Sequence, residues 1–362
     1  MNGAESVSER GPGWPPRPPD AHALTTAAAG LVAAAAGWFL LRELAPLLRP
    51  LLLAVLLCYA LLPAHNWLRR RLPDAAALAV LAVASAGIVF LGGLLFQRSA
   101  VELYDELPAL VARGQYLFGE ARDFLAGHLP PWLAGFGIEL PSAEAAGANK
   151  LREGLGALVG HAADVLLEAV VVGFYLVFML LEAGRFPQRV RAAFAPDRAE
   201  QILAVAGRVN AAIAGYFKIK VKASLVLAVP VTLVLAAFGV KFPLFWGALT
   251  FFCNFIPYLG SAFACTAPIV LALLQLGLGW QPAVVAGLLI AVHLMSAYLV
   301  EPALTGKAVG LSPLVILASL AFWYLCWGLT GMFLAVPLTV VLKIVLENVA
   351  LARPFARLLG EE

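Results

Sequence analysis

Residues 242–274 read FPLFWGALTFFCNFIPYLGSAFACTAPIVLALL and are apolar enough to lie in a lipid bilayer. Midway, the stretch is interrupted by polar or helix-breaking residues, namely Asn254, Pro257, Tyr258, Gly260 and Ser261. In hydrocarbon every backbone N–H and C=O must be paired, so a break at that depth is tolerated only where protein or water surrounds it. The break therefore predicts a functional site rather than a plain membrane anchor.

The composition predicts an all-α, polytopic membrane protein. Of 362 residues, 62% are hydrophobic and 13% are charged, against roughly 25% charged residues in an average soluble domain. The apolar residues form several blocks of roughly 17 to 25 residues, the length that crosses a bilayer as a helix. We expect about eight transmembrane helices, with a small helical extracytoplasmic insert and broken helices in the C-terminal half.

The placement of charges divides the chain along its length. Arginine clusters at 69–71 and 185–208 indicate cytoplasmic loops, which predicts that both termini are cytoplasmic. The predicted divisions are a disordered tail (1–22), three transmembrane helices (23–96), the extracytoplasmic insert (97–160), a fourth transmembrane helix (161–182), a basic cytoplasmic linker (183–217), a transmembrane transport core (218–350) and a C-terminal tail (351–362).

The insert contains an apolar stripe at helical spacing between Leu103 and Phe124. This pattern predicts a helical cap on the outer membrane surface or, alternatively, a helix contact between copies of the chain. Pro108 is expected to start or kink one of these helices.

The motif search predicts that the protein is not an enzyme. The sequence has no phosphate-binding loop and no G-x-S-x-G, H-E-x-x-H or C-x-x-C motif. The four cysteines lie inside apolar blocks without metal-type spacing, so no metal site or cofactor is expected. We also expect no nucleic-acid partner.

A second interrupted segment resembles the first. Trp246 and Gly247 lead to Pro257, while Trp327 and Gly328 lead to Pro337 at nearly the same spacing. Paired interrupted spans are typical of a transport site built from repeats. A chance similarity in a chain rich in Leu, Ala and Gly is the interpretation we favour.

Few ionisable residues lie near or within the apolar blocks. His161, Asp164 and Glu168 share one helix face. They form either a proton or cation relay or, as we favour, a water-exposed cluster near the start of a helix. Glu301 either lines a pathway or caps a loop with Lys307. The lysines of the basic triplet at 218, 220 and 222 are expected to extend their stems to the headgroups.

Four motifs in the C-terminal half resemble one known family. They are N-x-I-P-Y-x-G-S (254–261), E-P-x-x-x-G-K (301–307), G-L-S-P (310–313) and G-M-x-x-A-V-P-L (331–338). In this order and with these apolar spacers, residues 205–350 resemble the autoinducer-2 exporter family of bacterial membrane proteins. One departure is that Pro268 stands alone where many relatives have a double proline.

The resemblance implies a homo-oligomer, expected to be a pentamer, that exports a small polar signalling molecule across the bacterial inner membrane without ATP. We therefore predict a secondary transporter that works by alternating access. The predicted substrate pathway consists of Asn254, Pro257, Tyr258, Gly260, Ser261, Glu301, Pro302 and Gly306. One alternative is a sodium/proton antiporter that uses Glu168, Asp164 or Glu301. The other is a membrane scaffold or regulator that binds partners through residues 97–160.

Overall fold

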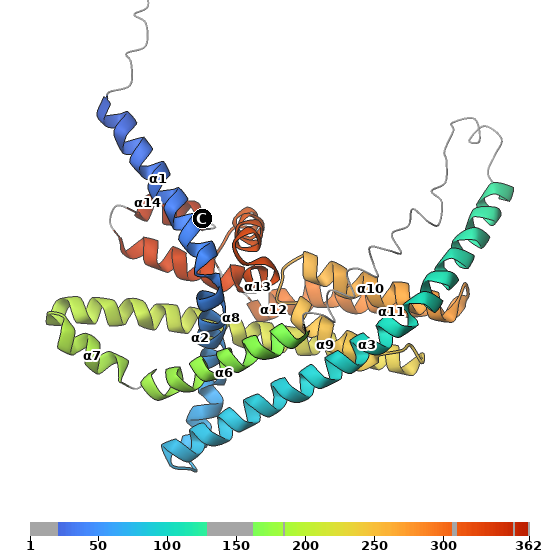
Figure 1. The fold of residues 1–362 in the computed structure, drawn as a ribbon, viewed down its shortest axis with the longest axis horizontal. Coiled ribbons are helices and arrows are strands. Elements are labelled where there is room, and N and C mark those ends of the chain that lie inside the picture. The colour runs from blue at the N-terminus through green and yellow to red at the C-terminus, as the bar shows by residue number, and fades with distance from the viewer. Residues whose placement is uncertain (1–20, 129–161, 184, 306–309, 350–351, 361–362) are drawn as a thin grey trace, which may run out of the picture. The chain divides into compact units, whose positions relative to one another are not determined.

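The structure is a computed structural model that describes residues 21–128, 162–183, 185–305, 310–349 and 352–360. Within these ranges every regular element is a helix, which confirms the prediction of an all-α protein (Figure 1). The chain divides into two compact units, residues 1–45 and 46–362. The first contains helix α1 (Ala21–Glu43). The predicted tail falls largely outside the described residues.

The second unit holds the other elements. Its N-terminal part consists of α2 (Ala45–Arg69), α3 (Asp74–His128), α6 (Ala162–Ala183) and α7 (Phe186–Ala193). Its C-terminal part consists of α8 (Pro196–Ala237), α9 (Pro243–Cys253), α10 (Leu259–Leu276), α11 (Trp280–Met295), η2 (Ser296–Val300), α12 (Glu301–Thr305), α13 (Pro313–Asn348) and α14 (Arg353–Leu358).

Two helices are longer than the sequence divisions indicate. The 55-residue helix α3 passes through residues 96 and 97 without a break, and Pro108 lies inside it rather than at its start. The 42-residue helix α8 likewise runs from the predicted cytoplasmic linker into the predicted transport core. Residues 129–160 of the predicted insert lie outside the described residues.

An apolar cluster in the N-terminal part joins three helices. It contains Ala54 and Cys58 of α2, Leu81 of α3, and Val172 and Leu176 of α6. Cys58 is therefore a buried, free thiol within an apolar contact, as expected for a small hydrophobic side chain.

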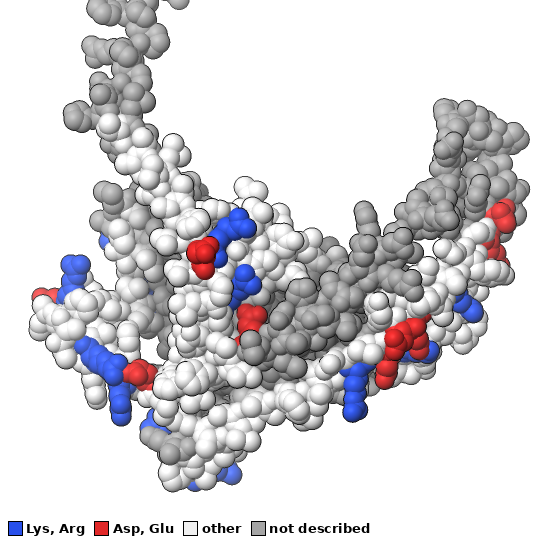
Figure 2. Space-filling model, viewed as in Figure 1, with Lys and Arg blue, Asp and Glu red and all other residues white. Residues whose placement is uncertain are grey.

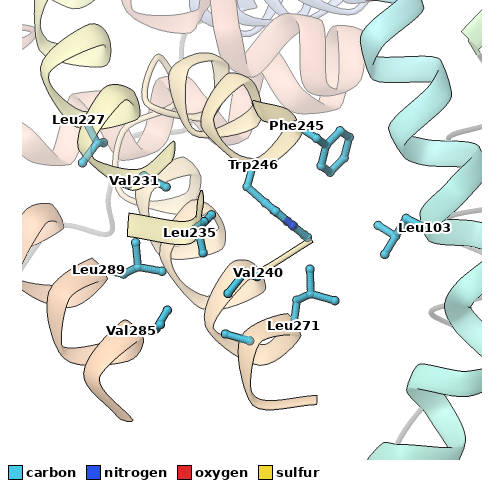
Figure 3. Close-up of a cluster of buried hydrophobic side chains, with 11 residues drawn as sticks. Leu103, Leu227, Val231, Leu235, Val240, Phe245, Trp246, Leu271, Val285 and Leu289 are labelled. Atoms are coloured by element: carbon cyan, nitrogen blue, oxygen red, sulfur yellow. The ribbon is translucent and has the colours of Figure 1, made fainter. Parts of the chain in front are cut away.

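The main core lies in the C-terminal part, where α8 packs against α9, α11 and α13. Its buried residues come from α8, α9, α10 and α11, together with Val240 from the link between α8 and α9 and Leu103 from α3. Figure 3 shows the Trp246 indole of α9 among these side chains, extending toward Val240 and Leu271. This core fixes α8 against the segment in which the helix between 242 and 274 is interrupted.

Five helices in the described residues are long and apolar enough to cross a membrane, or six if the bent pair 168–182 and 186–193 forms one span. Shorter apolar helices cover 45–59 and 243–253. On the face drawn in Figure 2, uncharged side chains predominate and charged side chains lie in separate groups. Large apolar side chains such as Leu233, Leu325 and Leu329 are more than half exposed, as expected where lipid is the solvent. The count of eight spans stays a prediction.

Candidate functional site

The helix break predicted from residues 254–261 is present between α9 and α10. Helix α9 ends at Cys253 and α10 begins at Leu259. Tyr258 adopts φ 63° and ψ −62°, and the Leu259 N–H donates a hydrogen bond of 2.7 Å to the Pro257 carbonyl. These are the features of a classic γ-turn, which is rare and strained for a residue with a side chain.

Gly260 allows the two helix ends to approach closely. A Cβ atom at this position would lie 1.7 Å from the carbonyl oxygen of Cys253, far inside van der Waals contact. The glycine is buried at the start of α10. The break thus depends on a residue without a side chain two positions after the strained turn.

Lys220 of α8 reaches the end of α9. Its ammonium donates a hydrogen bond of 3.0 Å to the backbone carbonyl of Asn254. It also forms a 2.8 Å ion pair with Glu301 Oε1, the side chains being 13% and 34% exposed. One lysine therefore joins the broken helix to the start of α12.

The expectation for the lysine triplet was wrong for Lys220. Steps of two residues on an α-helix alternate between faces, so Lys218 and Lys222 share one side while Lys220 faces the other. Lys218 and Lys222 are exposed, whereas Lys220 is directed into the protein.

The side chain of Asn254 is held by α8 as well. It is only 3% exposed, and its Nδ2 donates a hydrogen bond of 3.1 Å to Ser224 Oγ, which is fully buried. Ser224 lies one helical turn after Lys220, on the same face of α8. The backbone carbonyl and the side-chain amide of Asn254 are thus both bound by one helix.

A second discontinuity positions Glu301. Residues Ser296–Val300 form a turn of π-helix between α11 and α12, and the Glu301 N–H donates to the Ser296 carbonyl. A π-turn shifts the register of the side chains that follow it, and such turns are frequent at functional sites. Here it precedes the carboxylate that pairs with Lys220.

Two buried hydroxyls occur on the elements that form this cluster. Tyr216 lies one turn before Lys220, within electrostatic range of Glu301, and Ser296 lies one π-turn before Glu301. Both are at most 8% exposed. Neither hydroxyl has a hydrogen-bond partner in the part of the chain that the structure describes. Buried hydroxyls without a partner are costly and therefore require an explanation.

The structure brings some predicted site residues together and not others. Asn254 and Glu301 meet through Lys220. Tyr258 and Pro302 are exposed, while Pro257 and Ser261 are half-buried. Gly306 and His161 lie outside the described residues. Glu168 is half-buried in α6 without a hydrogen bond or ion pair to a described residue, and nothing is described of the Asp164 side chain.

The sequence reasoning did not select Lys220, Ser224, Tyr216 or Ser296 as site residues. A signal was available in α8, because positions 216, 220 and 224 place polar groups at successive turns of a face that continues as Leu227, Val231 and Leu235. Among the described residues no group of three or more His, Cys, Asp or Glu side chains is arranged to bind a metal ion.

The chain matches the description "AI-2E family transporter" over residues 28–351. It belongs to the AI-2E transporter family. The resemblance found in the four C-terminal motifs is thereby confirmed, and the matched range includes both discontinuities and Lys220. The protein is a multi-pass membrane protein of a transporter family.

Proteins with similar sequences are named as transport proteins or permeases. The AI-2 transport protein TqsA of Escherichia coli (strain K12) is 35% identical over 186 residues, 51% of this chain and 53% of TqsA. This match spans about half the length of the relative. A putative transport protein of Mycobacterium tuberculosis (strain CDC 1551 / Oshkosh) is 32% identical over 314 residues, 85% of this chain and 84% of the relative. The putative permease PerM of Escherichia coli (strain K12) is 30% identical over 337 residues, 88% and 91% of the two chains.

Proposed function

We propose that this protein is a secondary transporter of the bacterial inner membrane that exports a small polar solute. The pathway runs past the cluster of Lys220, Asn254, Ser224 and Glu301. Of the remaining predicted pathway residues, Pro257, Tyr258, Gly260, Ser261 and Pro302 shape the two discontinuous segments that Lys220 joins. Gly306 lies outside the described residues and stays a predicted pathway residue.

One observation supports this proposal above all. A lysine inside an apolar helix bundle binds both the freed carbonyl at the α9–α10 break and the carboxylate that follows the π-turn. Ionisable groups in membrane segments are costly and usually functional. Discontinuous helices that present backbone dipoles to polar groups are the typical construction of transporter binding sites.

The chemistry of the cluster favours a neutral or weakly charged solute with several hydroxyl groups. The ammonium and carboxylate neutralise each other, which lowers the attraction for a strongly charged solute. The Asn254 amide and the hydroxyls of Tyr216 and Ser296 offer donors and acceptors. A furanosyl compound of the autoinducer-2 type has this character, and TqsA is named for AI-2 transport.

The mechanism is alternating access, with the Lys220–Glu301 pair as a contact that must be remade. The pair joins α8 to α12, so a relative displacement of these segments separates the two charges. When Lys220 and Glu301 separate, both charged groups and the Asn254 carbonyl lose their hydrogen-bond partners. Water or solute hydroxyls then take the place of these partners. Solute binding thereby lowers the free energy of the open arrangement.

The test is transport of labelled solutes, beginning with autoinducer-2, into everted vesicles. Lys220→Gln and Asn254→Ala are compared with Lys218→Gln, which removes an exposed lysine from the opposite side of α8. We expect at least about tenfold slower transport for Lys220→Gln, since a hydrogen bond to a charged group is worth roughly 1.5–3 kcal/mol. For Asn254→Ala we expect transport to be about two- to tenfold slower, since this change removes the neutral hydrogen bond to Ser224 but keeps the carbonyl that Lys220 binds. The control should be unchanged. If variants that insert normally transport as fast as wild type, the cluster is not in the pathway.

Sodium/proton antiport is the second candidate, favoured by the partly buried carboxylate of Glu301. Such a group exchanges a proton for a cation when its lysine partner moves away. Proton flux on addition of sodium to everted vesicles measures this activity. A flux that Glu301→Gln abolishes supports antiport, while absence of a sodium-dependent signal in wild type rejects it.

A further inference from the structure

An open groove lies on the exposed side of α8, between this helix and the η2–α12 segment. Its volume is about 570 Å³, and it is lined by Lys222, Leu225, Val226, Leu299, Val300, Ala303 and Leu304. Six of these seven side chains are apolar. The groove is thus a hydrophobic surface groove whose lining includes one cationic side chain, that of Lys222.

The position of Lys222 differs from that of Lys220. Lys222 shares its face of α8 with Leu225 and Val226, which are about half exposed, whereas Lys220 belongs to the opposite, inward face with Ser224. Lys222 is itself exposed and makes no hydrogen bond or ion pair with the residues that the structure describes. Its ammonium is therefore available to an external anion.

We propose that this groove binds an anionic phospholipid, with an acyl chain along the apolar lining and the headgroup phosphate at Lys222. A lysine beside a lipid-facing apolar surface binds acidic headgroups electrostatically while its stem lies along the chains. A second copy of the chain is the alternative occupant, and it would have to place a carboxylate against Lys222 to avoid burying an unpaired charge.

The groove lies next to the proposed transport cluster. Its walls are the two segments that hold Lys220 and Glu301, since Lys222 is two residues after Lys220, and Val300 and Ala303 flank Glu301. A lipid in contact with both walls stabilises the arrangement in which the ion pair is formed. The bound lipid thereby favours one conformation over an arrangement in which α8 and α12 separate.

The experiment measures thermal unfolding and lipid affinity of the full-length purified protein in detergent. Phosphatidylglycerol is compared with phosphatidylcholine of the same acyl chains and with inorganic phosphate. For the wild type we expect phosphatidylglycerol to raise Tm more than either of the others. Lys222→Gln should bind phosphatidylglycerol about fivefold more weakly, the contribution of one lysine near an anionic surface, while Lys218→Gln should bind as wild type does.

A second variant tests the apolar part of the site. Ala303→Phe fills the groove with a side chain on the exposed surface of α12 and should weaken binding without loss of Lys222. The proposal is overturned if phosphatidylcholine or phosphate raises Tm as much as phosphatidylglycerol, or if Lys222→Gln binds as wild type does. It is also overturned if Ala303→Cys forms disulfide-linked dimers that wild type does not, because a second copy would then cover the groove.

Discussion

The break between α9 and α10 and the kink inside α13 are two interruptions with similar local chemistry and different surroundings. At the first, Tyr258 has φ 63°, and Gly260 is packed against the Cys253 carbonyl. At the second, Gly328 has φ 63° and ψ −142°, and a Cβ on Gly331 would lie 1.9 Å from the Trp323 carbonyl. Each interruption therefore combines one residue at positive φ with a close glycine contact shortly after it.

The surroundings differ in polarity. The first break has a polar side, where Lys220 and Ser224 bind Asn254. The kink in α13 lies beside the apolar cluster of Leu320, Met332 and Ala335. The two interruptions also touch, because the Phe255 ring stacks on Phe333 at 4.8 Å between centroids. A helix can thus be broken for packing alone, and the polar partners distinguish the candidate site.

The positions of the two interruptions bear on the possible internal repeat. The spacing from Trp-Gly to Pro is similar in the two segments, yet Pro257 lies within its break, whereas Pro337 lies nine residues after Gly328 and inside a helix. Gly247 is inside α9, where its contact is Thr232. The interruptions therefore do not occur at corresponding positions, which supports chance similarity of the two short segments.

The largest expected effect is that of a side chain at the two contact glycines. Gly260→Ala and Gly331→Ala each place a Cβ within 2 Å of a backbone oxygen, so the helix ends must separate. We expect a loss of about 3 kcal/mol or more in the free energy of unfolding, at the upper end of overpacking, seen as a lowered Tm. Gly287→Ala is the control, because nothing lies within 4 Å of its added Cβ, and Tm should stay the same or rise. Equal Tm values for all three would mean that the close contacts are absent.

The sequence could reveal the first break but not its partners. Asn254, Pro257 and Gly260 are local signals, and local signals are readable from one segment. Lys220 and Glu301 are 81 residues apart. The sequence around Lys220 does not indicate that Glu301 is its partner, nor does the sequence around Glu301 indicate Lys220. The sequence did not locate the kink at Gly328 either. Proline is the expected helix breaker, yet α13 continues through Pro337, because a membrane helix accommodates proline where neighbouring groups compensate for the lost hydrogen bond.

The next effect concerns the glycine-only conformation in α13. Gly328→Ala puts a side chain at φ 63° and ψ −142°, a region that is essentially open only to glycine. We expect a loss of about 2 kcal/mol from this strain, again measured as Tm, and little change in the intrinsic transport rate of the folded fraction. A rate that falls as far as it does in Lys220→Gln would instead assign the kink to the pathway and remove the contrast between the two regions.

A smaller effect is expected for the ion pair at the first break. Lys220→Gln, Glu301→Gln and the double variant form a cycle that isolates the coupling between the two side chains. Because Glu301 is about one-third exposed, we expect only about 1 kcal/mol of coupling. Urea titration of the four proteins measures it. No coupling would show that the pair does not join α8 to α12, while the Lys218→Gln/Glu301→Gln cycle should give none.

The smallest effect tests the strain at Tyr258. Tyr258→Gly relieves the γ-turn but raises the entropy of the unfolded chain, so the net gain in stability over wild type should be below about 1 kcal/mol. Tyr258→Ala separates the loss of the ring from the relief of backbone strain. It removes the ring, which is 57% exposed, but keeps a side chain in the strained conformation. Glycine should therefore give a higher Tm than alanine at 258, as at 328, and a lower Tm than alanine at the helical position 287. A higher Tm for alanine at 258 would mean that the turn is unstrained, and the two interruptions would then differ in their backbone as well as in their surroundings.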